Sequence, residues 1–299
     1  MKSYTHDVDV IIPVHERKEL LISAIESVFA QSFVSFHITV IDDQSHTFKA
    51  YEVIASYIQL ISDPIILDQF NNKVTVITLT ENRGPAYCRN LGVARNKAPF
   101  IAFLDSDDLW HEEKLSIQIE YMKNNIEFGY SHTAEKWIRQ NKEIKQKGRY
   151  KKQGGFFIER CFQRCLISTS AIVFRRTFWE TLDEHFLPHF KIAEDYEFWL
   201  RLNFIYPAGY IDKPLTIKQA GDWSQLSSTS EIDRNRVLAL HRFYRINKNH
   251  PRFMSIQIFW KEELLKKIAI LIKGSTKYNH PNKLFQYQSW QKLMNYRFK

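Results

Sequence analysis

Three aspartates stand within the four residues Asp105–Asp108, directly after the apolar run Phe100–Leu104. Carboxylates this close repel one another unless a cation or hydrogen-bond donors compensate their charge. A divalent ion is the simplest compensation, and carboxylate oxygens suit Mg²⁺ or Mn²⁺, which share their coordination shell with substrate phosphates. The alternative is a solvated turn from a strand into a helix, with Asp107 or Asp108 as N-cap before Leu109.

A second acidic pair, Asp42-Asp43, follows the apolar run His37–Ile41, and Arg89 lies between the two acidic clusters in the chain. An acid, a cation and a metal site in one cleft would suit a nucleotide diphosphate. Neither Gly-x-Gly-x-x-Gly nor Gly-x-x-x-x-Gly-Lys-Ser/Thr occurs, so a dinucleotide site and a P-loop are not indicated. Metal and basic side chains would have to hold the diphosphate.

The elements that position these residues alternate along the first hundred residues. Apolar runs predict strands at Val8–Val14, His37–Ile41, Val74–Leu79 and Phe100–Leu104, with helical patterns between them. This repetition with short connections implies right-handed crossovers and a doubly wound, mainly parallel sheet flanked by helices. Ligands of such sheets bind beyond the carboxyl ends of the strands, so both acidic clusters should meet in one cleft.

The later part of the chain has a different pattern. A helix with Ile126 as its last apolar position follows the acidic cluster, and the basic run Lys136–Lys152 predicts a hairpin or mobile flap. Regular patterning returns at Ser168–Phe174 and in a helix over Glu194–Phe204. From about Glu231 the chain is helical and basic, with an apolar stripe formed by Trp260, Leu264, Ile268 and Leu271.

We therefore divide the chain into an α/β domain and a helical extension. The domain spans 1–228, with a nucleotide-binding half at 1–108 and an acceptor-binding half at 109–228 that contains a basic flap at 136–155. The extension spans 229–299. Its basic amphipathic character fits packing on the domain, formation of an oligomer, or peripheral contact with a membrane surface.

Composition limits the class of protein. The chain has 299 residues, 44% of them hydrophobic, and a formal net charge of +9, which favours anionic partners. The polar start lacks a secretory signal, and no apolar run is long enough to span a membrane, so we expect a cytoplasmic protein. Cys161 and Cys165 have no second ligand pair, so a zinc site is not expected. His111 and His132 are expected to be surface or packing histidines.

Five motifs in order resemble the family 2 glycosyltransferases of GT-A fold, of the bacterial non-processive type. The motifs are Val10–Val14, Val40–Ser45, Asn82–Gly92, Phe103–Asp108 and Glu194–Trp199. Each motif is weak alone, but their order and spacing together are specific. The resemblance implies a Rossmann-like fold for nucleotide-diphospho-sugars. The chain lacks a Gln-x-x-Arg-Trp segment, which argues against a processive synthase.

The resemblance also implies roles for individual residues. Those expected to bind the donor nucleotide are Pro13, Val14, Glu16, Asp43, Arg89 and Asp105. Asp43 matches the acid that hydrogen-bonds the base, usually uracil. Asp105 and Asp107 match the Asp-x-Asp element, with Asp107 as the direct metal ligand. Asp195 matches the catalytic base of inverting members, although Glu194 and Asp195 could instead be ordinary acidic residues of a first helical turn.

The remaining site expectations concern the metal shell and the acceptor. Asp222 stands where a bacterial subgroup has histidine, and it could complete the metal shell, although the substitution weakens the match. Glu194 and Trp199 are candidates for the acceptor site. Trp199 and Tyr196 could stack on a sugar, but aromatic residues at this spacing also suit a hydrophobic core.

The resulting hypothesis is an inverting transfer of one sugar, most simply from a UDP-sugar, to a hydroxyl of a cell-envelope glycan or lipid-linked precursor. Mn²⁺ or Mg²⁺ would be the cofactor, and the protein could contact the inner face of the membrane. The alternatives are a catalytically silent GT-A scaffold subunit, a nucleotidyltransferase and a nucleic-acid-binding protein. The chain lacks the glycine-rich loop of a nucleotidyltransferase, and it contains no known motif for reading nucleic acid.

Overall fold

The computed structural model describes residues 6–140, 142–145, 148–221 and 231–297, and it divides into two units. The first unit contains the β-sheet and comprises the chain up to Phe156 together with Leu166–Lys191 and the segment that begins at Tyr206. The second unit is helical and comprises Phe157–Cys165, Ile192–Ile205 and the helices of the C-terminal part.

The first half of the sheet is parallel, as the sequence predicts. Its strands are β1 (Val8–Val14), β2 (Phe36–Asp42), β3 (Val74–Thr78) and β4 (Phe100–Phe103), in the spatial order β3-β2-β1-β4. The side chains of β1, β2 and β4 are almost all buried, which explains their near-continuous apolar sequences. All four predicted strands are confirmed to within two residues at each end.

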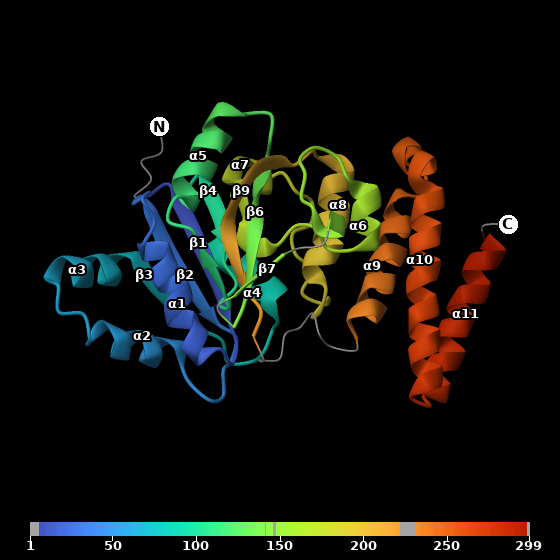
Figure 1. The fold of residues 1–299 in the computed structure, drawn as a ribbon, viewed down its shortest axis with the longest axis horizontal. Helices are drawn as coiled ribbons and strands as arrows, with labels where there is room; N and C mark the ends of the chain where they lie inside the picture. Colours follow the sequence, from blue (N-terminus) through green and yellow to red (C-terminus); the bar gives the residue numbers. More distant parts are fainter. Residues whose placement is uncertain (1–5, 141, 146–147, 222–230, 298–299) are drawn as a thin grey trace. The chain divides into compact units, whose positions relative to one another are not determined.

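Helices connect these strands (Figure 1). They are α1 (Lys18–Phe29), α2 (Ala50–Ile58), α3 (Pro64–Lys73) and α4 (Pro85–Arg95). The sequence analysis missed α3, although its start carries a clear signal. Asp63 is the N-cap and accepts hydrogen bonds from the backbone N–H groups of Ile65 and Ile66, and Pro64 occupies the first helical position.

The second half of the sheet mixes strand directions, which the sequence pattern did not predict. Its strands are β5 (Asp108–Trp110), β6 (Tyr130–Arg139), β7 (Lys142–Ile144), β8 (Ile172–Arg175) and β9 (Gly209–Gln219). β8 pairs antiparallel with β4 and β6, β6 pairs parallel with β9, and β9 pairs antiparallel with β5. β7 folds back on β6, so the hairpin predicted in the basic segment is confirmed.

Of the two interpretations of the acidic turn, the one in which Asp107 or Asp108 is a helix N-cap is excluded, because β5 begins at Asp108 and pairs with β9. The prediction that the following helix includes Ile126 is wrong. The next helix, α5 (Lys114–Asn124), ends before Ile126, whose side chain is 82% exposed and takes no part in the core. The short helix α7 (Arg176–Trp179) follows β8.

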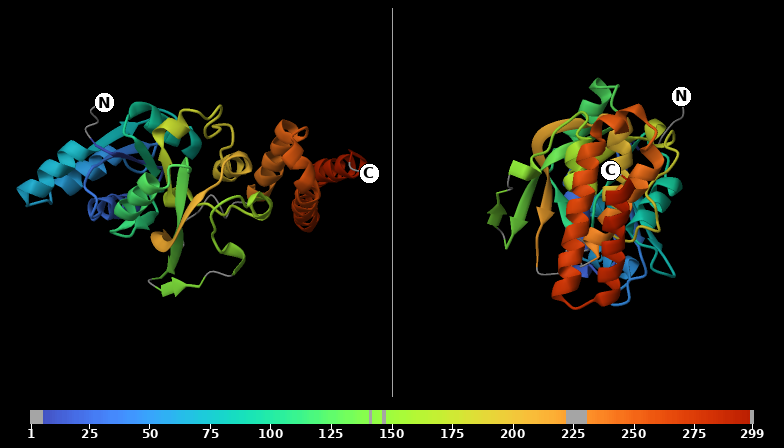
Figure 2. Two further views of the ribbon diagram at one scale, coloured as in Figure 1. Left: turned by 90° about the horizontal axis from the view of Figure 1, so that it is seen from above. Right: turned by 90° about the vertical axis from the view of Figure 1, so that its right-hand side faces the viewer.

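The second unit contains α6 (Ile158–Gln163), α8 (Glu194–Ile205), α9 (Ile232–Asn247), α10 (Pro251–Lys277) and α11 (Pro281–Arg297). The helices α9, α10 and α11 lie side by side, and the right-hand view of Figure 2 shows α10 running alongside α11. The predicted stripe of α10, Trp260, Leu264, Ile268 and Leu271, is buried as expected. Within the described residues, no helix combines the length and apolarity that crossing a lipid bilayer requires.

Candidate functional site

The loop that opens α4 is fastened to the end of β2 by Asp43. Its carboxylate accepts the backbone N–H of Arg83 at 2.7 Å on Oδ1 and that of Gly84 at 2.8 Å on Oδ2. Gly84 has a φ of +83°, a conformation that glycine adopts without the strain a Cβ would bring. Each carboxylate oxygen keeps a further lone pair, so Asp43 can fix this loop and still accept a bond from a ligand.

The end of β1 lies beside this loop. The Val14 carbonyl accepts the backbone N–H of Asp43 at 2.9 Å, and Pro13 pairs with Ile41. Glu16 then turns the chain at a φ of +52°, and its carboxylate accepts bonds from Thr47 Oγ1 and the His46 N–H. These two bonds lower the pKa of Glu16. The structure thus gathers Pro13, Val14, Glu16 and Asp43 at the carboxyl ends of β1 and β2.

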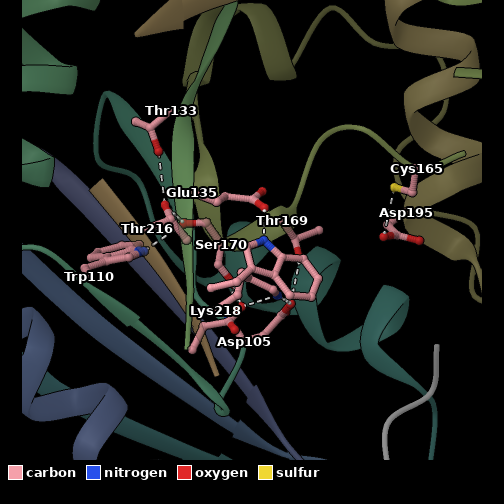
Figure 3. Close-up of polar contacts among 12 residues, drawn as sticks. Asp105, Trp110, Thr133, Glu135, Cys165, Thr169, Ser170, Asp195, Thr216 and Lys218 are labelled. Atoms are coloured by element: carbon pink, nitrogen blue, oxygen red, sulfur yellow. Dashed lines mark hydrogen bonds and ion pairs between the residues drawn. The ribbon is translucent and has the colours of Figure 1, made fainter. Parts of the chain in front are cut away.

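Arg89 of α4 reaches the carboxyl end of β4, where it pairs with Asp105. Its Nη2 lies 2.8 Å from Asp105 Oδ1. The Thr169 hydroxyl donates to Asp105 Oδ2 at 2.9 Å, as Figure 3 shows. Burial raises the pKa of Asp105, but the cations of Arg89 and Lys218 outweigh it and bring the pKa down to about 2. Asp105 is therefore ionised and fixed between two donors.

Asp108 stands opposite Lys218 in the pairing of β5 with β9. The Lys218 ammonium contacts Asp108 Oδ2 and lies 3.9 Å from Asp105 Oδ2, and the Ser170 hydroxyl donates to Asp108 at 2.5 Å. Burial and the neighbouring carboxylates of Asp107 and Asp105 raise the pKa of Asp108, and Lys218 opposes them. Sequence reasoning missed Lys218, because no local signal shows that it meets a residue 110 positions away.

The charge compensation expected from a metal is therefore partly supplied by side chains, namely Arg89 and Lys218. A metal could still bind at this turn. Asp105 and Asp107 lie within one tight turn that the Asp108 N–H closes on the Asp105 carbonyl at 3.0 Å, and both are partly exposed. In the described part of the chain, no group of three or more His, Cys, Asp or Glu side chains could hold a metal. The residues fit an ion shared with donor phosphates, not one held by protein alone. Asp222 lies outside the described residues.

A second ion pair lies close to this cluster. Lys152 Nζ is 2.8 Å from Glu135 Oε1, and the Trp137 ring N–H donates to Glu135 Oε2 at 3.0 Å. Burial raises the pKa of Glu135, but the charges of Lys152 and Lys218 bring it below its ordinary value. The predicted basic flap thus contributes at least one lysine, Lys152, to the interior of the first unit.

Asp195 lies in the second unit, at the start of α8. Its Oδ1 accepts the Tyr196 N–H at 2.6 Å, and the Cys165 thiol donates to its Oδ2 at 3.3 Å, as the right-hand side of Figure 3 shows for the thiol. Ala193, just before this helix, has a φ of +62°, which is strained for a residue with a Cβ. Strain of this kind concentrates at functional sites, and it is found here beside the predicted base.

The acceptor roles expected on the same helix have different outcomes. Trp199 is 1% exposed and packs against Phe198, and Tyr196 is equally buried, with its hydroxyl donating to the Phe162 carbonyl. The prediction that a sugar stacks on Trp199 is therefore wrong, because the Trp199 side chain is buried in the hydrophobic core around α8. Glu194 is also buried, at the first turn of α8.

The histidines outside these clusters behave as the sequence analysis expects. His132 is buried and its Nε2–H donates to the Gln153 carbonyl at 3.0 Å. Burial, together with the charge of Lys152, lowers its pKa to about 4. His111 is exposed beside Glu113. Among the described residues, Cys88, Cys161 and Cys165 form no disulfide bond.

Known proteins resemble the chain in both sequence and fold. The family model described as glycosyl transferase family 2 matches residues 9–182. An uncharacterized glycosyltransferase of Rickettsia felis is 33% identical over 223 residues, which is 72% of this chain but only 33% of the relative. The chain thus spans about a third of that relative's length.

A second relative carries a more specific name. WfgD of Escherichia coli, a UDP-Glc:alpha-D-GlcNAc-diphosphoundecaprenol beta-1,3-glucosyltransferase, is 29% identical over 196 residues, 65% of this chain and 69% of the relative.

Among solved structures, TarS 1–349 of S. aureus in complex with UDP-GlcNAc aligns with a TM-score of 0.63 over 96% of this chain and 92% of its own. At 17% identity this likeness shows the fold alone, and it confirms the predicted GT-A architecture. The family model extends from β1 through α7 and covers more than half of the chain. The predicted motifs within this range lie in β1, at the carboxyl ends of β2 and β4, and at the start of α4. The chain belongs to glycosyl transferase family 2.

Proposed function

We propose that this protein transfers a single sugar, with inversion, from a nucleotide-diphosphate sugar to a hydroxyl group. The observation that carries the proposal is the fixed pair of Arg89 and Asp105 at the carboxyl end of β4, beside the loop that Asp43 holds. This edge of a parallel sheet is where such folds bind nucleotides. Membership of glycosyl transferase family 2 supplies the class of reaction.

Uridine diphosphate is the leading donor nucleotide. The TarS structure contains UDP-GlcNAc and the name of WfgD specifies UDP-Glc, so both relatives point to uridine. In this proposal Pro13, Val14, Glu16 and Asp43 line the nucleotide pocket, and Arg89 approaches the phosphates. Asp105 would orient the donor sugar and phosphates through its exposed edge.

The chemistry requires a base and a means of stabilising the leaving group. Asp195 would take the proton of the acceptor hydroxyl as its oxygen attacks the anomeric carbon and the bond to the diphosphate breaks. One such displacement inverts the anomeric centre. Arg89 and Lys218 would offset negative charge that develops on the diphosphate. Asp107, with Asp222 as a further candidate, would hold Mn²⁺ or Mg²⁺, which supplies Lewis-acid stabilisation of the same charge when bound.

The proposed acceptor is a cell-envelope glycan or its lipid-linked precursor. WfgD acts on a sugar attached to diphosphoundecaprenol, according to its name. A lipid-linked acceptor would place the protein at the inner face of the cell membrane, with residues 229–299 as a basic helical extension able to contact that surface. Glu194 remains the candidate for acceptor binding.

Calorimetric titration of the full chain tests the proposal most directly. The protein would be titrated with uridine, guanosine, thymidine and cytidine diphosphates, each with and without Mn²⁺. We expect binding of one nucleotide, strengthened by the metal, with uridine diphosphate as the ligand. If no nucleotide binds under either condition, the donor site is wrong and a catalytically silent GT-A subunit becomes the better interpretation. Binding of another base would correct the donor and retain the site.

A further inference from the structure

The ammonium group of Lys218 lies against the acidic turn Asp105–Asp108. The register of β5 against β9 sets Lys218 directly opposite Asp108, and Lys218 also lies 3.9 Å from Asp105 Oδ2. Figure 3 shows its side chain beside Asp105, near Thr169 and Ser170. Because the pairing of β5 with β9 fixes residue 218 opposite Asp108, the fold itself places this lysine beside the turn.

The burial of Asp108 favours a cation beside it. The Asp108 side chain is 1% exposed, and an ionised carboxylate at that depth needs a charged partner or several donors. Asp105 and Lys218 are open to solvent at 25% and 21%, so the cluster faces water on the side of these two residues. The Lys218 ammonium contacts the Asp108 carboxylate and lies close to that of Asp105, and such neighbours favour the charged form of a lysine.

We propose that Lys218 is the resident counter-ion of the acidic turn and thereby sets how strongly this turn attracts a divalent cation. A fixed positive charge within a few ångströms of Asp105 and Asp108 repels Mn²⁺ or Mg²⁺ and cancels part of the attraction of the carboxylates. The turn alone then holds a divalent ion weakly. Metal binding becomes favourable when the donor's diphosphate adds negative charge, so donor and metal enter the site together. This last step rests on the proposed function.

Lys152 provides a matched control. Its ammonium is also inside the first unit and pairs with a buried carboxylate, but in the described part of the chain its partners are the Glu135 carboxylate and the Leu166 carbonyl, not the aspartates of the turn. A general effect of removing a buried lysine would appear in both lysine variants. An effect of the counter-ion on the acidic turn would appear only at Lys218.

The test is titration of Mn²⁺ alone, followed by calorimetry, with the wild-type full chain and the variants Lys218→Met, Lys218→Arg and Lys152→Met. We expect weak binding in the wild type and at least about tenfold tighter binding in Lys218→Met. Lys218→Arg keeps the positive charge and should stay within about twofold of the wild type, and Lys152→Met within about threefold. Equal affinity in wild type and a folded Lys218→Met variant would overturn the proposal.

Lys218→Met leaves Asp108 buried without its cation and could therefore unfold. The pair Asp108→Asn and Asp108→Asn/Lys218→Met repeats the comparison with a neutral group at position 108, where Asp105 and Asp107 remain to bind the ion. The double variant should bind Mn²⁺ at least about tenfold more tightly than the single one. Absence of measurable binding in every variant that lacks Lys218 also overturns the proposal. Because no nucleotide is used, failure of the proposed donor site leaves this result intact.

Discussion

At the residue scale, the two acidic clusters differ in what their carboxylates contact and in their exposure to solvent. Asp43 uses both carboxylate oxygens to hold the loop before α4, whereas Asp105 and Asp107 stand at a partly exposed turn. Asp105 is already engaged by Arg89 and Thr169. In the proposed function, Asp107 is the residue that would bind a metal, and Asp195 is the residue that would accept a proton.

Replacing Asp107 by asparagine should abolish the part of donor binding that depends on metal. Asparagine keeps the size of the side chain but removes the charge that a hard cation prefers. In calorimetry with uridine diphosphate, we expect the increase in affinity that Mn²⁺ causes to be at least about tenfold smaller than in the wild type. The affinity measured without metal should change little. The exposed Asp183→Asn serves as control. A gain from Mn²⁺ equal to that of the wild type would contradict the metal assignment.

Replacing Asp195 by asparagine should separate binding from chemistry. The amide oxygen can still accept the Tyr196 N–H, so the start of α8 is preserved, but the amide cannot take a proton. We expect unchanged affinity for the donor nucleotide and a rate of sugar transfer lower by about 10²- to 10⁴-fold, the usual contribution of a general base. Transfer and donor binding would be measured on the same preparation. Full activity in this variant would remove Asp195 from the mechanism.

At the scale of elements, α5 joins the sheet through a buried polar network. Lys114 is fully buried. Its ammonium lies 2.8 Å from Gln118 Oε1 and 4.3 Å from the centroid of the Trp110 ring. Gln118 Nε2 in turn donates to the carbonyls of Ser131 and Ala171. Burial lowers the pKa of Lys114 to about 7 from its ordinary value of 10.5.

This shift predicts a pH dependence of stability. Between pH 10.5 and about 7 the unfolded chain protonates Lys114 and the folded chain does not, so the lysine lowers the free energy of unfolding progressively as pH falls. The full effect is on the order of a few kcal/mol. Lys114→Met should remove this slope between pH 7 and 10 in urea unfolding, whereas Lys123→Met, exposed on the same helix, should keep it. Equal slopes in Lys114→Met and wild type would contradict the shifted pKa.

The elements also show where sequence patterns suffice. Strands β1, β2 and β4 were predicted because each is a buried apolar run in a parallel half-sheet, and β3 because its sequence is rich in β-branched residues, although it is only partly buried. The same reasoning did not predict the antiparallel insertion of β8 between β4 and β6. It also did not predict β5, because a three-residue strand has no periodicity to read.

At the scale of the whole molecule, the positive charge is concentrated in the C-terminal part. Residues 229–299 contain 15 Lys and Arg against 4 Asp and Glu, whereas residues 1–228 contain 27 against 29. The outer face of α11 adds exposed apolar side chains, including Phe285 at 73% and Tyr296 at 80%. Basic and aromatic side chains together favour an anionic membrane surface as the partner.

The full chain should therefore bind vesicles that contain phosphatidylglycerol, and binding should weaken with salt. Each surface lysine contributes about 1 kcal/mol, so Lys273→Gln/Lys277→Gln/Lys292→Gln should weaken vesicle binding by about a hundredfold at low salt. The control Lys97→Gln/Lys123→Gln/Lys213→Gln removes the same charge from exposed positions of the first unit. Co-sedimentation measures both variants. Equal losses in the two triple variants would show that net charge, not this surface, controls binding.

The sequence by itself determined the family, the parallel half-sheet, the strand ends where Asp43 and Asp105 lie, and the helix that carries Arg89, because these features depend on residues close together in the chain. The tertiary structure alone decided what surrounds them. Lys218 meets Asp108 through strands that are distant in sequence, and Trp199 faces the core of the second unit. Such contacts depend on the register of strand pairing and the packing of helices, which long-range burial selects and no local pattern encodes.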